Sequence, residues 1–102
     1  LTHAHVGHYT GLFKLGLEMM NTKEIPLYAM PKLMSFLHNN LSTEFLFQSR
    51  NIVPHELHNK KHLTLSEDLN ISPFLVPHRN ELSETVGFRL LSSNKSVTLC
   101  LK

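Results

Sequence analysis

The sequence predicts an α/β fold in which two helices pack on one outer face of a mixed β-sheet, as in half of an αββα sandwich. Apolar residues at helical spacing occupy two stretches near the beginning, residues 10–21 and 31–37. Short apolar runs between turn-forming residues fill most of the remainder. A length of 102 residues suits one domain at most.

The first expected helix runs from Thr10 to about Asn21. Its apolar residues are dense enough for burial on much of its surface: Leu12, Phe13, Leu15, Leu17, Met19 and Met20. Thr10 can cap its start, and polar residues 21–23 follow its end. Such a helix would direct the positive end of its dipole toward the residues before Thr10.

A buried strand and a second helix are expected next. Residues 25–29 are apolar and β-forming, and Pro26 near the start of a strand removes no required ladder donor. Pro31 suits the first turn of a helix that carries an apolar stripe over residues 33–37 and ends at Asn39-Asn40. Residues 42–50 fit either a short helix or an irregular apolar loop, and the pattern does not decide between them.

The rest of the chain is predicted to form an antiparallel meander of short strands. Its strands are expected at residues 51–53, 57, 63–65, 70–76, 85–91 and 97–101. Polar and turn-forming residues separate these runs, including Asn94-Lys95 before the last one.

Three histidines near the start have the spacing of a metal site. His3 and His5 are two residues apart, so an extended backbone places both rings on one side, and a turn can bring His8 beside them. Imidazole binds zinc and also suits iron, copper and nickel. The alternative is a polar histidine-rich loop that binds nothing.

This motif resembles that of a known family. Residues 1–8, Leu-Thr-His-Ala-His-Val-Gly-His, followed by Thr10-Gly11-Leu12, resemble the His-x-His-x-Asp-His motif of the metallo-β-lactamase superfamily, with Gly7 in place of aspartate. Residues 73–79 and 83–90 resemble the later segment in which a strand delivers another ligand histidine, here His78. With residues 25–31, the likeness within the superfamily is greatest to pyrroloquinoline quinone biosynthesis protein B and similar proteins.

The resemblance implies that residues 1–102 are a partial metallo-β-lactamase-type domain whose N- and C-terminal parts are missing. The chain begins with Leu inside a strand-to-loop transition, and the family's later aspartate and histidine ligands would follow Lys102. The implied metal ligands within the chain are His3, His5, His8 and His78. Glu81 and Glu84 are candidates for supporting carboxylates, although ordinary loop positions explain them more simply.

The function implied is that of a metal-dependent hydrolase whose His-ligated divalent ion activates water for attack on a small-molecule substrate. Zinc is favoured over iron or manganese, and no catalytic side chain is assigned. Two alternatives stay open: an iron-dependent oxidative enzyme of pyrroloquinoline quinone biosynthesis, and a degenerate metal-binding domain. One metal is expected, because two dications about 4 Å apart repel by about 17 kcal/mol at an effective dielectric of about 20, and Gly7 supplies no carboxylate to offset this.

The remaining candidate side chains have simpler explanations. His38 lies near the end of an expected helix, where the dipole favours a cation, so a structural role is expected. Three histidines of a polar segment lack ligand spacing and are expected to be solvated: His55, His58 and His62. Cys100 lies in an expected strand and is predicted to be an inert buried thiol.

Charge and hydropathy narrow the possible partners. The formal net charge of +2 comes from residues spread over several loops, which does not indicate nucleic-acid binding. No apolar run approaches the ~20 residues of a transmembrane helix, so no membrane partner is expected. A cytoplasmic location is expected, and the oligomeric state is left open.

Overall fold

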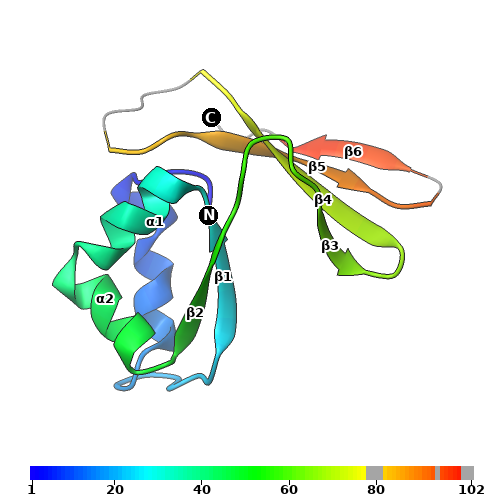
Figure 1. Cartoon of the computed structure of the whole chain (residues 1–102). Coiled ribbons are helices and arrows are strands. Elements are labelled where there is room, and N and C mark those ends of the chain that lie inside the picture. The colour runs from blue at the N-terminus through cyan, green and yellow to red at the C-terminus, as the bar shows by residue number, and fades with distance from the viewer. Residues whose placement is uncertain (78–81, 94, 100–102) are drawn as a thin grey trace.

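The computed structural model describes residues 1–77, 82–93 and 95–99 and shows two sheets, one of them flanked by helices (Figure 1). Strands β1 (Ile25–Ala29) and β2 (Ile52–Glu56) form a parallel pair. An antiparallel sheet contains, in order, β3 (Leu63–Ser66), β4 (Leu69–Leu75), β5 (Val86–Leu91) and β6 (Ser96–Leu99). The predicted α/β class is confirmed, with the parallel and antiparallel pairs in separate sheets.

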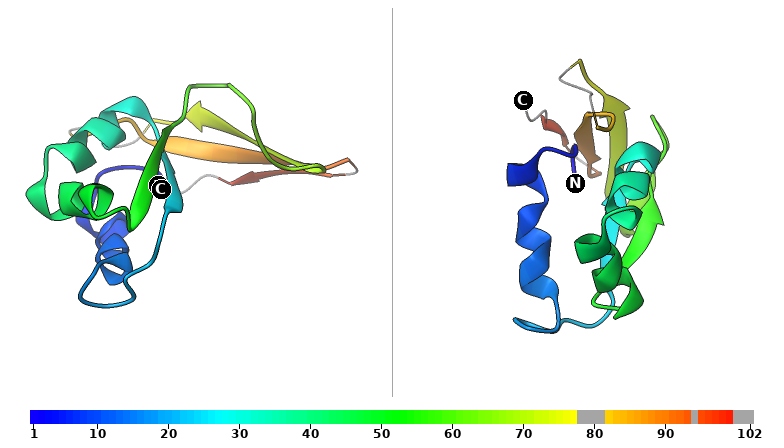
Figure 2. Two further views of the ribbon diagram at one scale, coloured as in Figure 1. Left: turned by 60° about the horizontal axis from the view of Figure 1, so that its bottom comes forward. Right: turned by 90° about the vertical axis from the view of Figure 1, so that its left-hand side faces the viewer.

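A strand–helix–helix–strand crossover makes up the first half of the molecule. Helices α1 (Pro31–His38) and α2 (Leu41–Gln48) connect β1 to β2 and lie to one side of both strands (Figures 1 and 2). Parallel strands require a long connection of this kind. Pro31 stands in the first turn of α1 as expected, and the undecided segment 42–50 is largely helical.

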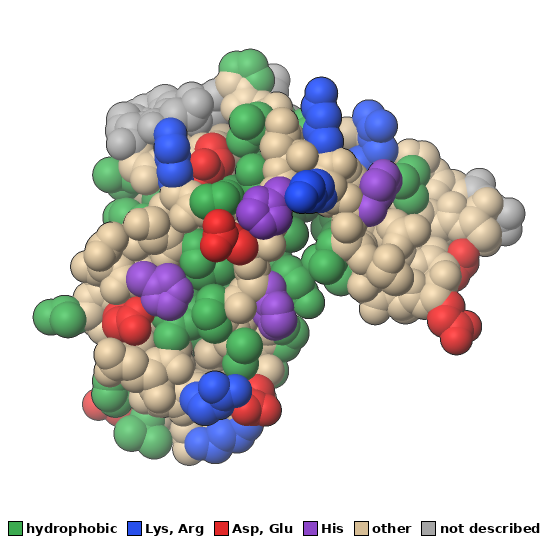
Figure 3. All heavy atoms as spheres, viewed as in Figure 1, with side chains coloured by type: hydrophobic (Ala, Val, Ile, Leu, Met, Phe, Trp, Pro, Cys, Tyr) green, Lys and Arg blue, Asp and Glu red, His purple; other side chains and the backbone are tan. Residues whose placement is uncertain are grey.

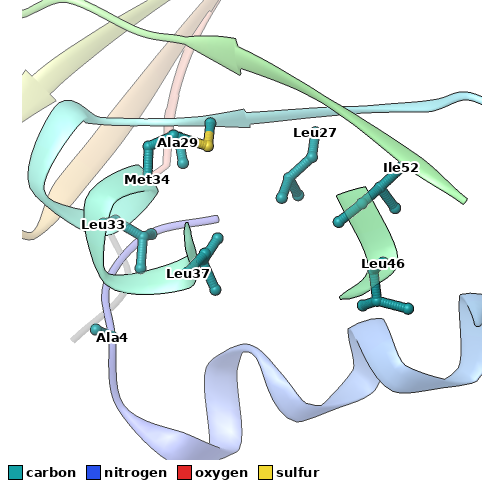
Figure 4. Packing of buried hydrophobic residues seen from close by; sticks show 8 residues of the cluster. All are labelled: Ala4, Leu27, Ala29, Leu33, Met34, Leu37, Leu46 and Ile52. Atoms are coloured by element: carbon teal, nitrogen blue, oxygen red, sulfur yellow. The ribbon is translucent and has the colours of Figure 1, made fainter. Parts of the chain in front are cut away.

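The main core fills the space between these helices and the parallel strands (Figure 4). Its buried apolar residues are Ala4, Leu27, Ala29, Leu33, Met34, Leu37, Leu46 and Ile52. Alternation along β1 and the four-residue spacing within α1 turn these side chains toward one another. Full burial of one leucine or isoleucine contributes about 1.5–3 kcal/mol to folding, so this cluster stabilises the crossover.

Residues 10–21 do not form the predicted α-helix. A single 3-10 turn, η1 (Val6–His8), is followed by a short 3-10 helix, η2 (Thr10–Leu15), and then by turns over residues 17–20. Gly16 ends η2 in extended conformation, and a Cβ there would lie 2.9 Å from Leu46 Cδ2. Glycine therefore permits close packing on α2 at the position where η2 ends. Residues 10–21 also lack the dipole that one long helix would have.

The predicted meander is correct for β3 to β6 and wrong for residues 51–57. Ile52 pairs in parallel with Ile25, so β2 belongs to the crossover. Pro54 is tolerated inside this strand because, within the described ranges, β2 pairs on one side only. Leu57 is not a strand residue but packs with Met30 and Val86 in a second small core that joins the crossover to the antiparallel sheet.

None of the helices found in residues 1–77, 82–93 and 95–99 has the length and apolar character needed to cross a membrane.

Candidate metal centre

The three histidines near the start of the chain lie together. The ring centroid of His3 is 4.5 Å from that of His5 and 4.3 Å from that of His8. His3 and His5 share a side because the backbone between them is extended, and η1 then turns the chain as His8 N–H donates to the carbonyl oxygen of His5 (2.8 Å). The clustering expected from the spacing is present, and metal binding by these residues stays a prediction.

Exposure differs among the three rings. His3 is 1% exposed, whereas His5 is half-buried and His8 is exposed. The Thr2 hydroxyl oxygen lies 3.0 Å from His3 Nδ1, within hydrogen-bond distance. When one ring nitrogen of a histidine binds a metal, a hydrogen bond at the other ring nitrogen orients the ring. An ion at this cluster would therefore bind His3 through Nε2 and reach solvent on the side of His8.

The backbone of the motif is anchored to a distant segment. Ala4 N–H, between the first two histidines, donates to Ser83 Oγ (2.9 Å), and Val86 N–H donates to the carbonyl oxygen of Thr2 (3.2 Å). All four residues are buried, and Ser83 Oγ donates in turn to the carbonyl oxygen of Glu84 (3.1 Å). A buried amide without its acceptor costs about 1–3 kcal/mol. Ser83 therefore stabilises the extended conformation on which the histidine geometry depends.

Sequence reasoning did not identify Ser83 as a site residue. Its partner Ala4 is 79 positions away, so no local spacing signals the contact. The only indirect sign is that Ser83 opens the second half of the block that resembles the later ligand segment.

Glu84 has a structural role at the start of α1. Its Oε1 atom accepts hydrogen bonds from the backbone N–H groups of Lys32 (2.8 Å) and Leu33 (3.2 Å). A helix leaves its first N–H groups without internal partners and favours negative charge at that end, so the carboxylate caps α1. Glu84 therefore links the segment that anchors the histidine motif to the start of α1. This structural role replaces the one considered for it as a supporting carboxylate of the metal.

The fourth ligand candidate, His78, lies outside the described residues, as do Glu81 and Cys100. The chain on either side of residues 78–81 is joined by a hydrogen bond from Val76 N–H to the carbonyl oxygen of Thr85 (3.0 Å). The residues that follow, 83–86, are those that anchor the histidine motif. The second block of sequence therefore contacts the first through residues 83–86. The part of His78 in the metal site stays a prediction.

The donor set fits a metal in kind. Three imidazoles suit zinc and neighbouring transition metals, and ligand nitrogens sharing one zinc lie about 3.3 Å apart for bonds of about 2 Å. Ring centroids at 4.3–4.5 Å are close enough for small rotations to achieve this. In the described ranges, however, no three or more His, Cys, Asp or Glu side chains are already placed to hold an ion.

The other described histidines have structural or surface positions. His38 Nδ1 lies 2.6 Å from Glu44 Oε2, and its ring stacks on Phe47 with the centroids 4.3 Å apart. Its role is therefore structural, as expected, because it joins α1 to α2. The polar segment carries three exposed histidines, also as expected: His55, His58 and His62.

Comparison with known proteins identifies the family of this chain. A sequence model described as "Beta-lactamase superfamily domain" matches residues 1–100. No curated protein and no solved structure matches the chain significantly. The narrower likeness to pyrroloquinoline quinone biosynthesis protein B is thus not confirmed by any relative.

Proposed function

The chain belongs to the beta-lactamase superfamily, and from this membership and the histidine cluster we propose that it acts as a metal-dependent hydrolase. The observation that carries the proposal is the packing of two imidazole rings on that of His3, with the centroids of His5 and His8 at 4.5 and 4.3 Å from it. Their backbone is held by buried hydrogen bonds from Ala4 to Ser83 and from Val86 to Thr2. A solvated histidine-rich loop would not need such long-range anchors.

Each residue of the proposed site has a distinct part. His3, His5 and His8 hold one divalent ion together with His78, zinc being favoured over iron or manganese. When bound, such an ion lowers the pKa of its water to about 7 and polarises a carbonyl or phosphoryl oxygen. Thr2 orients the ring of His3, and the exposed side of His8 faces an incoming small-molecule substrate.

The test is the metal content of the full-length protein purified without chelators. Elemental analysis should find about one equivalent of zinc, because the chain has Gly7 where a second site needs a carboxylate. The double variant His3→Ala/His5→Ala should lose this metal. The matched variant His55→Ala/His58→Ala removes two exposed histidines and should keep it. Equal metal content in the two variants would contradict the assignment.

Turnover separates the hydrolase from its alternatives. The zinc-loaded protein should hydrolyse generic ester or phosphodiester substrates, and the His3→Ala/His5→Ala variant should not. Metal without turnover would indicate a degenerate binding domain. Iron as the native metal, with no hydrolysis, would favour the oxidative alternative, since imidazole donors serve iron as well.

A further inference from the structure

The antiparallel sheet carries a pocket of about 340 Å³ on its polar face. Its polar and aromatic lining residues are Lys60, His62, Ser72, Phe74, Arg89 and Ser96. The opposite face, which includes Ile71 and Phe88, is apolar and lies toward Leu1 and Tyr28. The pocket shares no residue with the histidine motif or with the segment that anchors it, so it is a separate feature of the molecule.

Strand register builds this pocket. Ser72 on β4 lies opposite Arg89 on β5, and residues directly opposite in an antiparallel pair share a face. Leu63 pairs with Ile71, so His62, the residue before β3, continues the row beside Ser72. Phe74 is two residues beyond Ser72 and returns to the same face. Three segments thus contribute basic, hydroxyl and aromatic side chains to one surface.

The loop before β3 holds Lys60 against this row. Lys60 N–H donates to the carbonyl oxygen of Pro73 on β4 (2.8 Å), and its φ of 60° is in the left-handed region, which is uncommon for a residue with a side chain. Asn59 Oδ1 also accepts a hydrogen bond from Leu75 N–H (3.3 Å). The loop is therefore fixed to the sheet at two points, and the position of Lys60 is set by the backbone.

The pocket is basic, since its lining in the described part of the chain includes Lys60 and Arg89 and no carboxylate. Asp68, in the β3–β4 turn, accepts hydrogen bonds from the backbone N–H (2.9 Å) and the hydroxyl (3.3 Å) of Ser93. Among the described residues Glu24 pairs with Arg50 and Glu44 contacts His38, so neither carboxylate is paired with Lys60 or Arg89. Figure 3 shows basic (blue) and His (purple) side chains together near the connection between β2 and β3, with one acidic (red) side chain beside them.

We propose that this pocket binds the phosphate-type oxyanion of a small molecule. The planar guanidinium of Arg89 suits two oxygens of such a group, and the Lys60 ammonium adds a point charge. Ser72 and Ser96 supply hydroxyl donors, while Phe74 offers an apolar surface for the organic part of the ligand. A bound dianion would also offset the repulsion between the two cations. This binding does not depend on a metal at the histidine motif.

The experiment is an NMR titration of the chelator-treated full-length protein with inorganic phosphate and with adenosine monophosphate, ionic strength being kept constant with chloride. Amide shifts should map to residues 60, 72, 74 and 89. Arg89→Gln should weaken binding by about tenfold, and Lys60→Gln by a similar factor, because each removes a charge-assisted hydrogen bond. Lys14→Gln removes the same charge outside the pocket and should leave binding unchanged.

Several results would overturn the proposal. Equal weakening by Lys14→Gln would show a general charge effect, and shifts confined to residues 3–8 would move the anion to the histidine motif. Acetate binding as tightly as phosphate would exclude a phosphate-type site. Much tighter binding of a single-stranded oligonucleotide than of adenosine monophosphate would replace the small molecule with nucleic acid. Because Arg89 and Lys60 are exposed, these variants are expected to fold, and their spectra verify it.

Discussion

Two segments of this molecule carry three histidines each within eight residues, and they differ in what holds them. In residues 3–8 the His3 ring is 1% exposed and lies 4.3–4.5 Å from its two neighbours. In residues 55–62 all three histidines are exposed. The difference shows that long-range packing, and not histidine content, makes a candidate metal centre.

The contrast has a structural cause. Ala4 belongs to the main core, and its N–H group is bound by Ser83, so the rings on either side of it are held from two directions. Residues 55–62 are also fixed to the sheet, through Asn59 and Lys60, but these contacts leave all three histidines exposed, and the ring of His55 stacks on Tyr28 with the centroids 4.9 Å apart. Changes that break the first set of contacts should therefore affect metal binding, and changes in the second segment should not.

The largest effect is expected from removing the core beneath the first segment. Leu37 is fully buried in α1, and Leu37→Ala should lower the free energy of unfolding by about 2–5 kcal/mol through lost burial and a residual cavity. Leu65→Ala, at a β3 position that is 46% exposed, is the control and should change it by about 0.5 kcal/mol or less. Chemical denaturation measures both. Similar losses would show that the core does not dominate stability.

Cutting the anchor itself should have the next largest effect. Ser83→Ala leaves the buried Ala4 N–H without its acceptor and should cost about 1–3 kcal/mol of stability. Zinc affinity should fall as well, because the extended backbone between His3 and His5 loosens. Ser93→Ala, which removes an exposed hydroxyl bonded to Asp68, is the matched control. Unchanged zinc affinity in Ser83→Ala, measured by calorimetry, would separate the anchor from the site.

A smaller effect is expected from Gly7→Asp, which should help residues 3–8 to bind a second metal ion. Gly7 has no positive φ, and a Cβ added there meets nothing within 4 Å, so Gly7→Asp introduces a carboxylate without strain. Affinity for a second Zn²⁺ or Mn²⁺ should rise by about tenfold, because the added charge offsets part of the repulsion between the ions. Gly11→Asp has the same open surroundings and serves as control. Identical calorimetric titrations of the two variants would mean that position 7 does not face the metal.

The smallest effect is expected at a histidine outside both segments. His38→Gln removes the contact between the imidazole of His38, whose side chain is 40% exposed, and the carboxylate of Glu44, whose side chain is 27% exposed. Exposed pairs contribute about 0.2–1 kcal/mol, so stability should fall by no more than that. Metal content should be the same as in the wild type. Loss of zinc in this variant would place a ligand role where the structure shows a contact between helices.

Local pattern alone determined a large part of this fold. Periods of two and of about 3.6 residues, with proline and asparagine at the boundaries, located β1, α1 and the strands from β3 to β6. The same period of two placed the His3 and His5 rings on one side, as found. These features depend on neighbours a few residues apart, so the sequence contains their cause directly.

Tertiary structure determined the features that depend on contacts between residues far apart in the sequence. The parallel pairing of Ile25 with Ile52 defines the crossover, and the stretch expected to be one helix ends at Gly16, where the chain packs closely on Leu46 of α2. Ser83 holds Ala4 across 79 positions, a contact that no periodicity encodes. Each of these depends on the packing of whole elements, which brings together groups that have no fixed spacing along the sequence. The histidine motif was therefore visible in the sequence, whereas the contacts that orient it are visible only in the fold.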